Sequence, residues 1–159
     1  MAILTLWLLL FLILGALLGF NMYAILCLQD LESDLINPHD ASSRVNQLAL
    51  PEFALQAAAT LALLGTQSWL MLLVHVPLAM FHLRLYGKNE HVVEVTDVFG
   101  RLAEERSRRT AKMAAYVVTF VFVIYRGTQT AVNSFMTEEG KAKAAEFFKD
   151  AVASNMHHF

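Results

Sequence analysis

The chain has 159 residues with a formal net charge of −2, and 57% of its residues are hydrophobic while only 16% are charged. Soluble domains carry about 25% charged residues, so this composition, with a mean hydropathy of +0.48, excludes an ordinary soluble protein and indicates a membrane protein with one compact domain. The single cysteine, Cys27, excludes an internal disulfide and a cysteine-based metal cluster.

The chain begins with an uncharged run over residues 2–29. A bilayer core about 30 Å thick needs roughly 20 helical residues, so we expect a transmembrane helix over residues 3–28. A secretory signal peptide is the alternative, but no basic residue precedes Leu6 and the run is longer than such a peptide needs. Cys27 is expected to be a small buried apolar side chain, with palmitoylation as the alternative.

An acidic connector, expected over residues 29–50, contains the sequence LESDLINP. Asn37-Pro38 requires an extended or turn conformation before the proline. Pro51 and Glu52 suit the first turn of the next helix, where a missing N–H costs nothing and a carboxylate meets the positive end of the helix dipole. The residues singled out here are Asp30, Glu32, Asp34, Asn37, Pro38, Pro51 and Glu52.

The long apolar stretch over residues 50–86 decides the number of spans. As one helix it would be on the order of 55 Å long, nearly twice the hydrocarbon thickness, so we expect it to fold back at residues 65–68. This predicts spans over residues 51–65 and 68–86, and a single crossing is the alternative. His75 and His82 share a helix face, but without an intramembrane carboxylate they make a poor metal site, and none is expected.

A fourth span is expected over residues 112–136, after a second connector at 87–111. Arg126 is the one formal charge inside a predicted span, and because intramembrane charge is costly we expect it to be paired, near water or snorkelling. If it lies about halfway along the span, we expect pairing with carbonyls or polar groups of neighbouring spans rather than a role in transport. The tail over residues 138–159 reads as an amphipathic helix with Phe147, Phe148 and Val152 on one side. It either rests on the lumenal membrane face or frays.

Four spans place both termini on one side of the membrane, and the basic residues test the orientation. Eight lie in or beside the connectors and three in the tail, which agrees with cytosolic connectors and lumenal or extracellular termini. A three-span arrangement weakens the bias to seven against four. The predicted fold is therefore an all-α polytopic four-helix transmembrane bundle. The eight basic residues are Arg44, Arg84, Lys88, Arg101, Arg106, Arg108, Arg109 and Lys112, and the three are Lys141, Lys143 and Lys149.

Four separated motifs resemble the cornichon family of endoplasmic-reticulum export receptors, in its fungal and plant-like members. They are DLESDLINP from Asp30, N-x-L-x-L-P-E from Asn46, W-(x)7-P from Trp69 and VTDVFGRL from Val95. VIYRG at residues 123–127 also resembles the last span of those members. The extension after Thr137 is longer than many members have, so its role is not implied by the resemblance.

The resemblance implies a cargo receptor that binds transmembrane transporters, channels or receptors within the bilayer and links them to the COPII coat. It implies a coat contact at Val98, Phe99, Gly100, Arg101 and Leu102. Independently, Val95, Val98, Phe99 and Leu102 have the spacing of one face of a short helix that Thr96 or Asp97 could cap. The alternative is that this face lies on the membrane or packs under the bundle.

The resemblance also implies a cargo contact at Leu63, Leu64, Gly65, Thr66 and Gln67, where a partner helix would dock by close packing and hydrogen bonds. The alternative is that these residues only make the turn.

No nucleophile–base pair, phosphate loop or nucleic-acid motif is recognised in the sequence, so no enzyme, cofactor or nucleic-acid partner is expected. The expected location is the endoplasmic-reticulum membrane with cycling to the Golgi. The partners are membrane lipid, cargo and coat, and a homo-oligomer remains open. A resident auxiliary subunit of an ion channel or transporter is the alternative function.

Overall fold

A computed structural model describes residues 2–88 and 92–156 of the chain, and within them it forms helices and no strand. Residues 89–91 of the expected second connector and 157–159 of the expected tail lie outside the described residues. The prediction of an all-α chain is confirmed. The helices are α1 (Ala2–Glu32), α2 (Pro38–Gly65), α3 (Trp69–Gly87), α4 (Val98–Met136) and α5 (Glu138–Met156).

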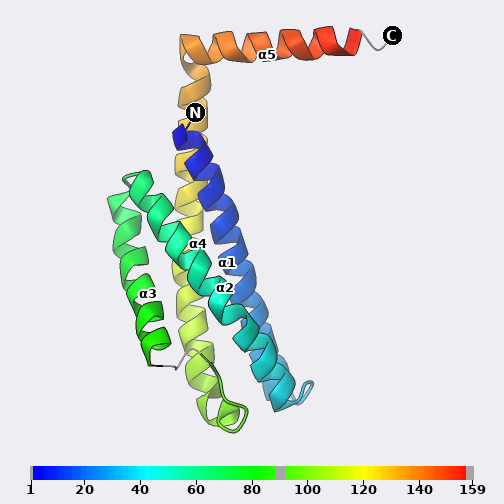
Figure 1. Cartoon of the computed structure of the whole chain (residues 1–159), viewed down its shortest axis with the longest axis vertical. Coiled ribbons are helices and arrows are strands. Elements are labelled where there is room, and N and C mark those ends of the chain that lie inside the picture. The colour runs from blue at the N-terminus through cyan, green and yellow to red at the C-terminus, as the bar shows by residue number, and fades with distance from the viewer. Residues whose placement is uncertain (1, 89–91, 157–159) are drawn as a thin grey trace.

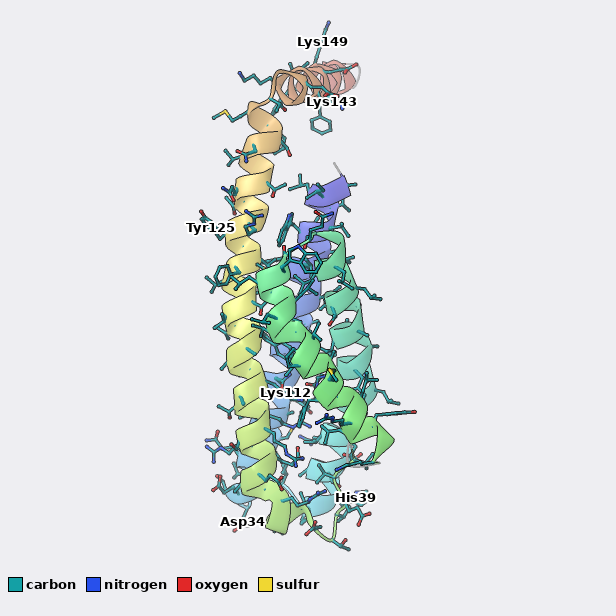
Figure 2. All side chains as sticks on the ribbon, turned by 90° about the vertical axis from the view of Figure 1, so that its left-hand side faces the viewer. Asp34, His39, Lys112, Tyr125, Lys143 and Lys149 are labelled. Atoms are coloured by element: carbon teal, nitrogen blue, oxygen red, sulfur yellow. The ribbon has the colours of Figure 1, made fainter. Side chains whose placement is uncertain are left out.

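Four of these helices, α1 to α4, are long and apolar enough to cross a membrane, which confirms four spans against three. Figure 1 shows α1 beside α4, α2 crossing them, and α3 packed on the outer side of α2. The start of α1, the α2–α3 turn and the end of α4 lie at one end of the bundle, which we call the upper end. Asp34 and His39 mark the opposite, lower end, and Tyr125 and Lys143 lie toward the upper one (Figure 2).

The second helix begins at Pro38, so the expected start at Pro51 is wrong. Asn37 is extended, at φ −81° and ψ 159°, and its side-chain oxygen accepts a hydrogen bond from the Asp40 N–H at 2.8 Å. This cap, with Pro38 in the first turn, is a strong helix start. Pro51 therefore lies inside the helix, where proline costs about 3 kcal/mol. Ala41 and Val45, both buried against α1, help to offset that cost.

The fourth helix begins at Val98 and runs for 39 residues, so the expected connector at residues 87–111 is helical over most of its length. No proline or glycine occurs between Gly100 and Gly127, and the sequence RLAEERSRRTAKMAA is rich in strong helix formers. At about 1.5 Å per residue the helix is roughly 58 Å long, which exceeds the hydrocarbon thickness. The helix is therefore longer than one crossing requires, and its charged first turns lie at the lower end of the bundle.

The turn between α2 and α3 occupies residues 66–68, as the sequence predicted. Gln67 has a φ of 53°, in the left-handed region, and Thr66 Oγ1 donates a hydrogen bond to the Leu63 carbonyl at 3.0 Å. The chain thus reverses direction within three residues.

The core of the bundle consists of two apolar clusters. The upper cluster joins α1 to the other three spans, and the lower cluster joins the end of α1, the start of α2 and the start of α4. Cys27 is buried in the lower cluster, as expected for a small apolar side chain. The upper cluster is built from Trp7, Leu10, Ile13, Leu14, Leu17, Ala59, Ala62, Leu63, Met71, Leu72, Tyr116 and Val123. The lower one comprises Ala24, Cys27, Leu28, Leu31, Ala41, Val45, Val93 and Val98.

Candidate functional site

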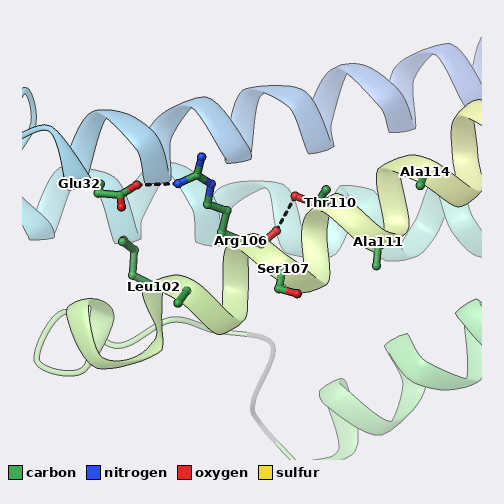
Figure 3. A pocket seen from close by; sticks show the side chains of 8 residues that line it. Glu32, Leu102, Arg106, Ser107, Thr110, Ala111 and Ala114 are labelled. Atoms are coloured by element: carbon green, nitrogen blue, oxygen red, sulfur yellow. Dashed lines mark hydrogen bonds and ion pairs between the residues drawn. The ribbon is translucent and has the colours of Figure 1, made fainter.

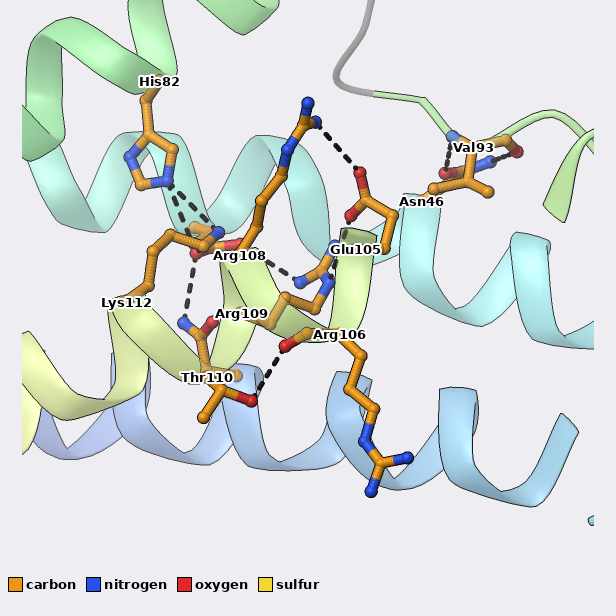
Figure 4. Close-up of polar contacts among 11 residues, drawn as sticks. Asn46, His82, Val93, Glu105, Arg106, Arg108, Arg109, Thr110 and Lys112 are labelled. Atoms are coloured by element: carbon orange, nitrogen blue, oxygen red, sulfur yellow. Dashed lines mark hydrogen bonds and ion pairs between the residues drawn. The ribbon is translucent and has the colours of Figure 1, made fainter. Parts of the chain in front are cut away.

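Glu52 is the centre of a buried polar layer to which all four spans contribute. Its side chain is 2% exposed. Lys112 Nζ and Asn21 Nδ2 donate hydrogen bonds to Glu52 Oε1 at 2.5 and 3.1 Å. His82 Nε2 lies 3.5 Å from the same oxygen, and Arg109 Nη1 lies 3.6 Å from Oε2. Figure 4 shows His82 and Lys112 pointing toward each other from α3 and α4.

The expectation that Glu52 sits in the first turn of a helix is therefore wrong. Because α2 begins at Pro38, Glu52 lies well inside the helix and faces the other spans. A carboxylate buried in this way is stable only with close cationic and hydrogen-bonding partners. Lys112, Arg109 and Asn21 supply them, so Glu52 fixes how α1, α2 and α4 meet.

The polar layer continues toward the lower end along α4. Glu105 Oε2 lies 3.8 Å from Arg109 Nε, and Glu105 Oε1 lies 3.4 Å from Arg108 Nη1. Arg108 also pairs with Glu104 at the surface. The buried carboxylates Glu52 and Glu105 thus share the neighbouring cations, which limits the cost of burying charge between the helices.

The two histidines of α3 both make polar contacts with α2. His75 is buried, and Gln56 Nε2 lies 3.2 Å from its Nδ1 and donates a hydrogen bond to its carbonyl at 3.3 Å. His82 contacts Glu52. The sequence analysis assumed that no carboxylate lies near these histidines within the membrane. This is wrong for His82, because Glu52 lies inside α2 and not at its first turn.

Arg126 is paired, but within its own helix and not with neighbouring spans. It is exposed, and its Nη1 donates a hydrogen bond to Gln129 Oε1 on its own helix at 3.2 Å. Nor is it the only formal charge within the spans, since Glu52 and Lys112 are buried between the helices. The start of α1 packs beside this part of α4, where a Cβ on the neighbouring Gly127 would lie 3.5 Å from Trp7 Cβ.

The acidic segment forms the turn between α1 and α2. Asp30 and Glu32 end α1, Asp34 has a φ of 56°, and Asn37 and Pro38 begin α2. Glu32 Oε2 accepts a hydrogen bond from Arg106 Nη1 at 2.7 Å, which ties this segment to α4. Figure 3 shows the pair beside a groove of about 580 Å³ along α4, lined further by Leu102, Ala103, Ser107, Thr110, Ala111 and Ala114.

The expected coat segment, residues 98–102, forms the first turns of α4. Val98 is 1% exposed in the lower cluster and Leu102 packs against that cluster, whereas Phe99 is 57% exposed. Gly100 is exposed, and Arg101 Nε lies 3.6 Å from an Asp97 carboxylate oxygen.

The expectation that Val95, Val98, Phe99 and Leu102 share one helix face is therefore wrong, and Val98 and Leu102 instead pack under the bundle, which was the alternative. Val95 precedes the helix in a turn, and Val98 points into the bundle, which leaves Phe99 as the large apolar side chain at the surface of residues 98–102. Of the two expected caps, Thr96 and Asp97, the N-cap residue is Asp97, but its side chain makes no capping hydrogen bond.

Asn46 connects this segment to α2. Its Oδ1 accepts a hydrogen bond from the Val93 N–H at 2.8 Å, and its Nδ2 donates one to the Val93 carbonyl at 3.0 Å (Figure 4). The motif N-x-L-x-L-P-E at residues 46–52 thus holds the connector just before VTDVFGRL at residues 95–102, and Leu48 and Leu102 of the two motifs pack against the same lower cluster. We call this region the lower-end site; its surface includes Phe99, Gly100 and the Glu32–Arg106 pair.

The expected cargo segment, residues 63–67, lies at the upper end. Leu63 is buried in the upper cluster, Leu64 is 48% exposed, and Gly65 and Gln67 are exposed. Thr66 Oγ1 bonds to the Leu63 carbonyl and to Ser68 Oγ. Thr66 therefore serves the turn, and Leu64, Gly65 and Gln67 are available to a partner.

Sequence analysis missed the buried partners of Glu52, although the pattern was present. Glu105, Arg109 and Lys112 recur at i, i+4 and i+7, the spacing of one helix face. Their assignment to a connector hid this pattern. Asn21 gives no comparable signal, because a single amide in an apolar run does not reveal which carboxylate it meets.

Comparisons with known proteins agree on one family. Residues 3–125 match the family model described as Cornichon protein. Protein cornichon homolog 2 of rice (Oryza sativa subsp. japonica) is 43% identical over 136 residues, covering 86% of this chain and 91% of the relative. ER-derived vesicles protein erv14 of Schizosaccharomyces pombe is 30% identical over 111 residues, covering 70% and 81%.

A second yeast relative gives the same result. ER-derived vesicles protein ERV15 of Saccharomyces cerevisiae is 32% identical over 106 residues, covering 67% of this chain and 75% of the relative. The family model covers α1, α2 and α3 and most of α4, including the Glu52 layer and the lower-end site. Together with the four-span bundle, these matches establish that the chain belongs to the cornichon family.

Proposed function

We propose that this protein is a cargo receptor for the export of transmembrane proteins from the endoplasmic reticulum. The observation that carries the proposal is its similarity, across most of the bundle, to two yeast proteins named for ER-derived vesicles. Its action is binding rather than catalysis. Cargo helices associate with the spans inside the bilayer, and COPII coat subunits contact the protein from the cytosol.

The lower-end site is the proposed coat contact. Phe99 is a large apolar side chain at the surface, and Val98 and Leu102 fix the helix turn that carries it. An exposed aromatic anchor on a rigid element is the kind of feature that dominates protein–protein affinity. The Asn46–Val93 hydrogen bonds hold the preceding connector and keep this turn in place.

The upper end is the proposed cargo contact. Leu64 and Gly65 are exposed near the turn, and a small residue lets a partner helix approach closely. Interhelical hydrogen bonds in membranes contribute roughly 1 kcal/mol or less. Modest affinity suits a receptor that releases its cargo after transport.

An in vitro budding reaction from microsomes tests the proposal. Phe99→Ala is expected to reduce the fraction of protein and cargo packaged into vesicles severalfold while cargo still co-purifies with the protein. Val95→Ala, a neighbouring exposed apolar change outside the helix, is the matched control and should leave packaging unchanged. Normal packaging of Phe99→Ala would contradict the coat assignment.

Leu64→Gln tests the cargo contact separately, with Leu61→Gln, which is 68% exposed on the same helix, as the control. Cargo recovery is expected to fall only for Leu64→Gln, and equal recovery from both variants would refute the assignment. If the protein instead accompanies one partner to its destination membrane and does not return, the auxiliary-subunit function replaces the receptor function.

The proposed orientation places the lower end in the cytosol and both termini in the lumen, with cycling between endoplasmic reticulum and Golgi. The bias of basic residues toward the lower end supports it. Epitope tags at each terminus should resist protease in sealed microsomes and become sensitive after detergent. Digestion of either tag in intact microsomes would overturn the orientation.

A further inference from the structure

The last helix, α5, joins the bundle through a bend encoded by specific residues. Thr137 is extended, at φ −68° and ψ 146°, and ends α4, and its hydroxyl donates a hydrogen bond to the Ser134 carbonyl at 2.9 Å. A Cβ on Gly140 would lie 1.9 Å from the same carbonyl oxygen, so glycine is required for this close approach. The bend makes α5 run across the axis of the bundle, as Figure 1 shows.

One face of α5 is apolar and lacks a covering element among the described residues. Phe147 and Phe148 are 72% and 69% exposed, and their ring centroids are 6.3 Å apart. The opposite face carries charged side chains, including Glu139 and Glu146, and Lys143 pairs with Glu139 at 3.0 Å near the boundary between the faces. Such two-sided helices are typical of membrane interfaces.

The apolar face of α5 is continuous with the membrane-facing surface of the bundle. Phe147 and Phe148 line a hollow of about 350 Å³ together with Leu4 of α1 and Phe135 of α4. Leu4 also lines a groove of about 450 Å³ between α1 and α4, which includes Leu8 and Ile124. The two hollows thus share Leu4, and apolar side chains make up most of their lining, with Lys143 and Ser134 at the edge of the first.

The length of α4 places α5 at the depth of the lipid headgroups. Met113 is the first residue after the basic part of α4, and 25 residues separate it from Glu138. At about 1.5 Å per residue this is roughly 37 Å. The hydrocarbon core is about 30 Å thick and the whole bilayer about 40–45 Å, so with Met113 at the lower edge of the core, α5 begins roughly 7 Å beyond its upper edge, in the headgroup layer.

We infer that α5 is an interfacial helix whose binding partner is the phospholipid leaflet at the upper end, with Phe147 and Phe148 inserted among the acyl chains. The sequence of α5 holds four acidic and three basic residues, so the helix has no excess positive charge. Burial of its apolar side chains therefore drives insertion, and anionic lipid is not required. The helix fixes the depth of the bundle in the bilayer. The inference rests on the four spans, and neither the coat nor the cargo assignment enters it.

Spin labels on opposite faces of α5 in the full chain test this inference. Ala144→Cys lies in the apolar hollow and leaves both phenylalanines intact, and Glu146→Cys is the matched site on the charged face. The native Cys27 is buried, and wild-type protein treated with the same spin label measures any background from it. In nanodiscs of phosphatidylcholine, the Ala144 label should collide severalfold more with oxygen than with a water-soluble nickel complex, and the Glu146 label should show the reverse.

Two further measurements distinguish a lipid partner from other partners. Phe147→Glu with Phe148→Glu should abolish the oxygen preference at Ala144, while addition of phosphatidylglycerol or salt should not change it. Equal exposure of both labels to nickel would mean that α5 is hydrated and would overturn the inference. Protection of the Ala144 label from both reagents would mean that a protein covers this face. Dependence on anionic lipid would mean that charge drives the binding. Either result would also overturn the inference.

Discussion

Replacing Glu52 by glutamine should destabilise the bundle strongly, because it removes the negative charge at the centre of the polar layer and preserves the size of the side chain. Lys112 and Arg109 would remain with side chains 8% and 7% exposed. Glu105, 3.8 Å from Arg109, would then be left to balance both buried cations. Removing one partner of a buried ion pair costs about 3–5 kcal/mol, and we expect a loss of this size.

Glu104→Gln is the matched control, since Glu104 pairs with Arg108 but its side chain is 55% exposed. Exposed pairs contribute about 0–1 kcal/mol. The free energy of unfolding, measured in bicelles by steric trapping, should therefore differ by several kcal/mol between the two variants. A double variant with Lys112→Met should recover part of the loss, because the two side chains are coupled. Equal stability of Glu52→Gln and Glu104→Gln would refute a buried ionic layer.

Three smaller changes test local features. Asn46→Ala removes both hydrogen bonds to the Val93 backbone and should cost about 1–3 kcal/mol, seen as faster hydrogen exchange at the Val93 amide; unchanged exchange would contradict it. Asn37→Ala removes the cap of α2 and should lower the unfolding free energy by about 1 kcal/mol, whereas no change would argue against capping there. Gly140→Ala should displace α5 and reduce the lipid contact of its apolar face, while Gly15→Ala, where no atom lies within 4 Å of the new Cβ, should not; equal lipid contact in both would refute the encoded bend.

The number of spans and the position of the tight turn could be predicted from the sequence because both follow from bilayer thickness. Helical rise limits how much apolar sequence one crossing can hold, and residues 65–68 are the polar, helix-weakening point of the central stretch. The helix starts could not be placed as well. Asn37-Pro38 and Pro51 both resemble helix starts, and only the burial of Ala41 and Val45 against α1 decides that one helix continues through Pro51.

The proposed coat contact was also predicted only in part from the sequence. Recognised motifs identified residues 98–102, but periodicity alone grouped Val95, Val98 and Phe99 on one face. The tertiary structure separates them, because Val98 fills the lower cluster while Phe99 remains at the surface.

Composition and length alone determined that this protein is a helical membrane bundle, since backbone groups in lipid must be hydrogen-bonded within each span. Tertiary structure alone decided that Glu52, Asn21, His82 and Lys112, distant in the sequence, form one buried layer. The cost of burying a charge depends on which side chains surround it in space, and spacing along a single helix carries no information about the neighbouring helices.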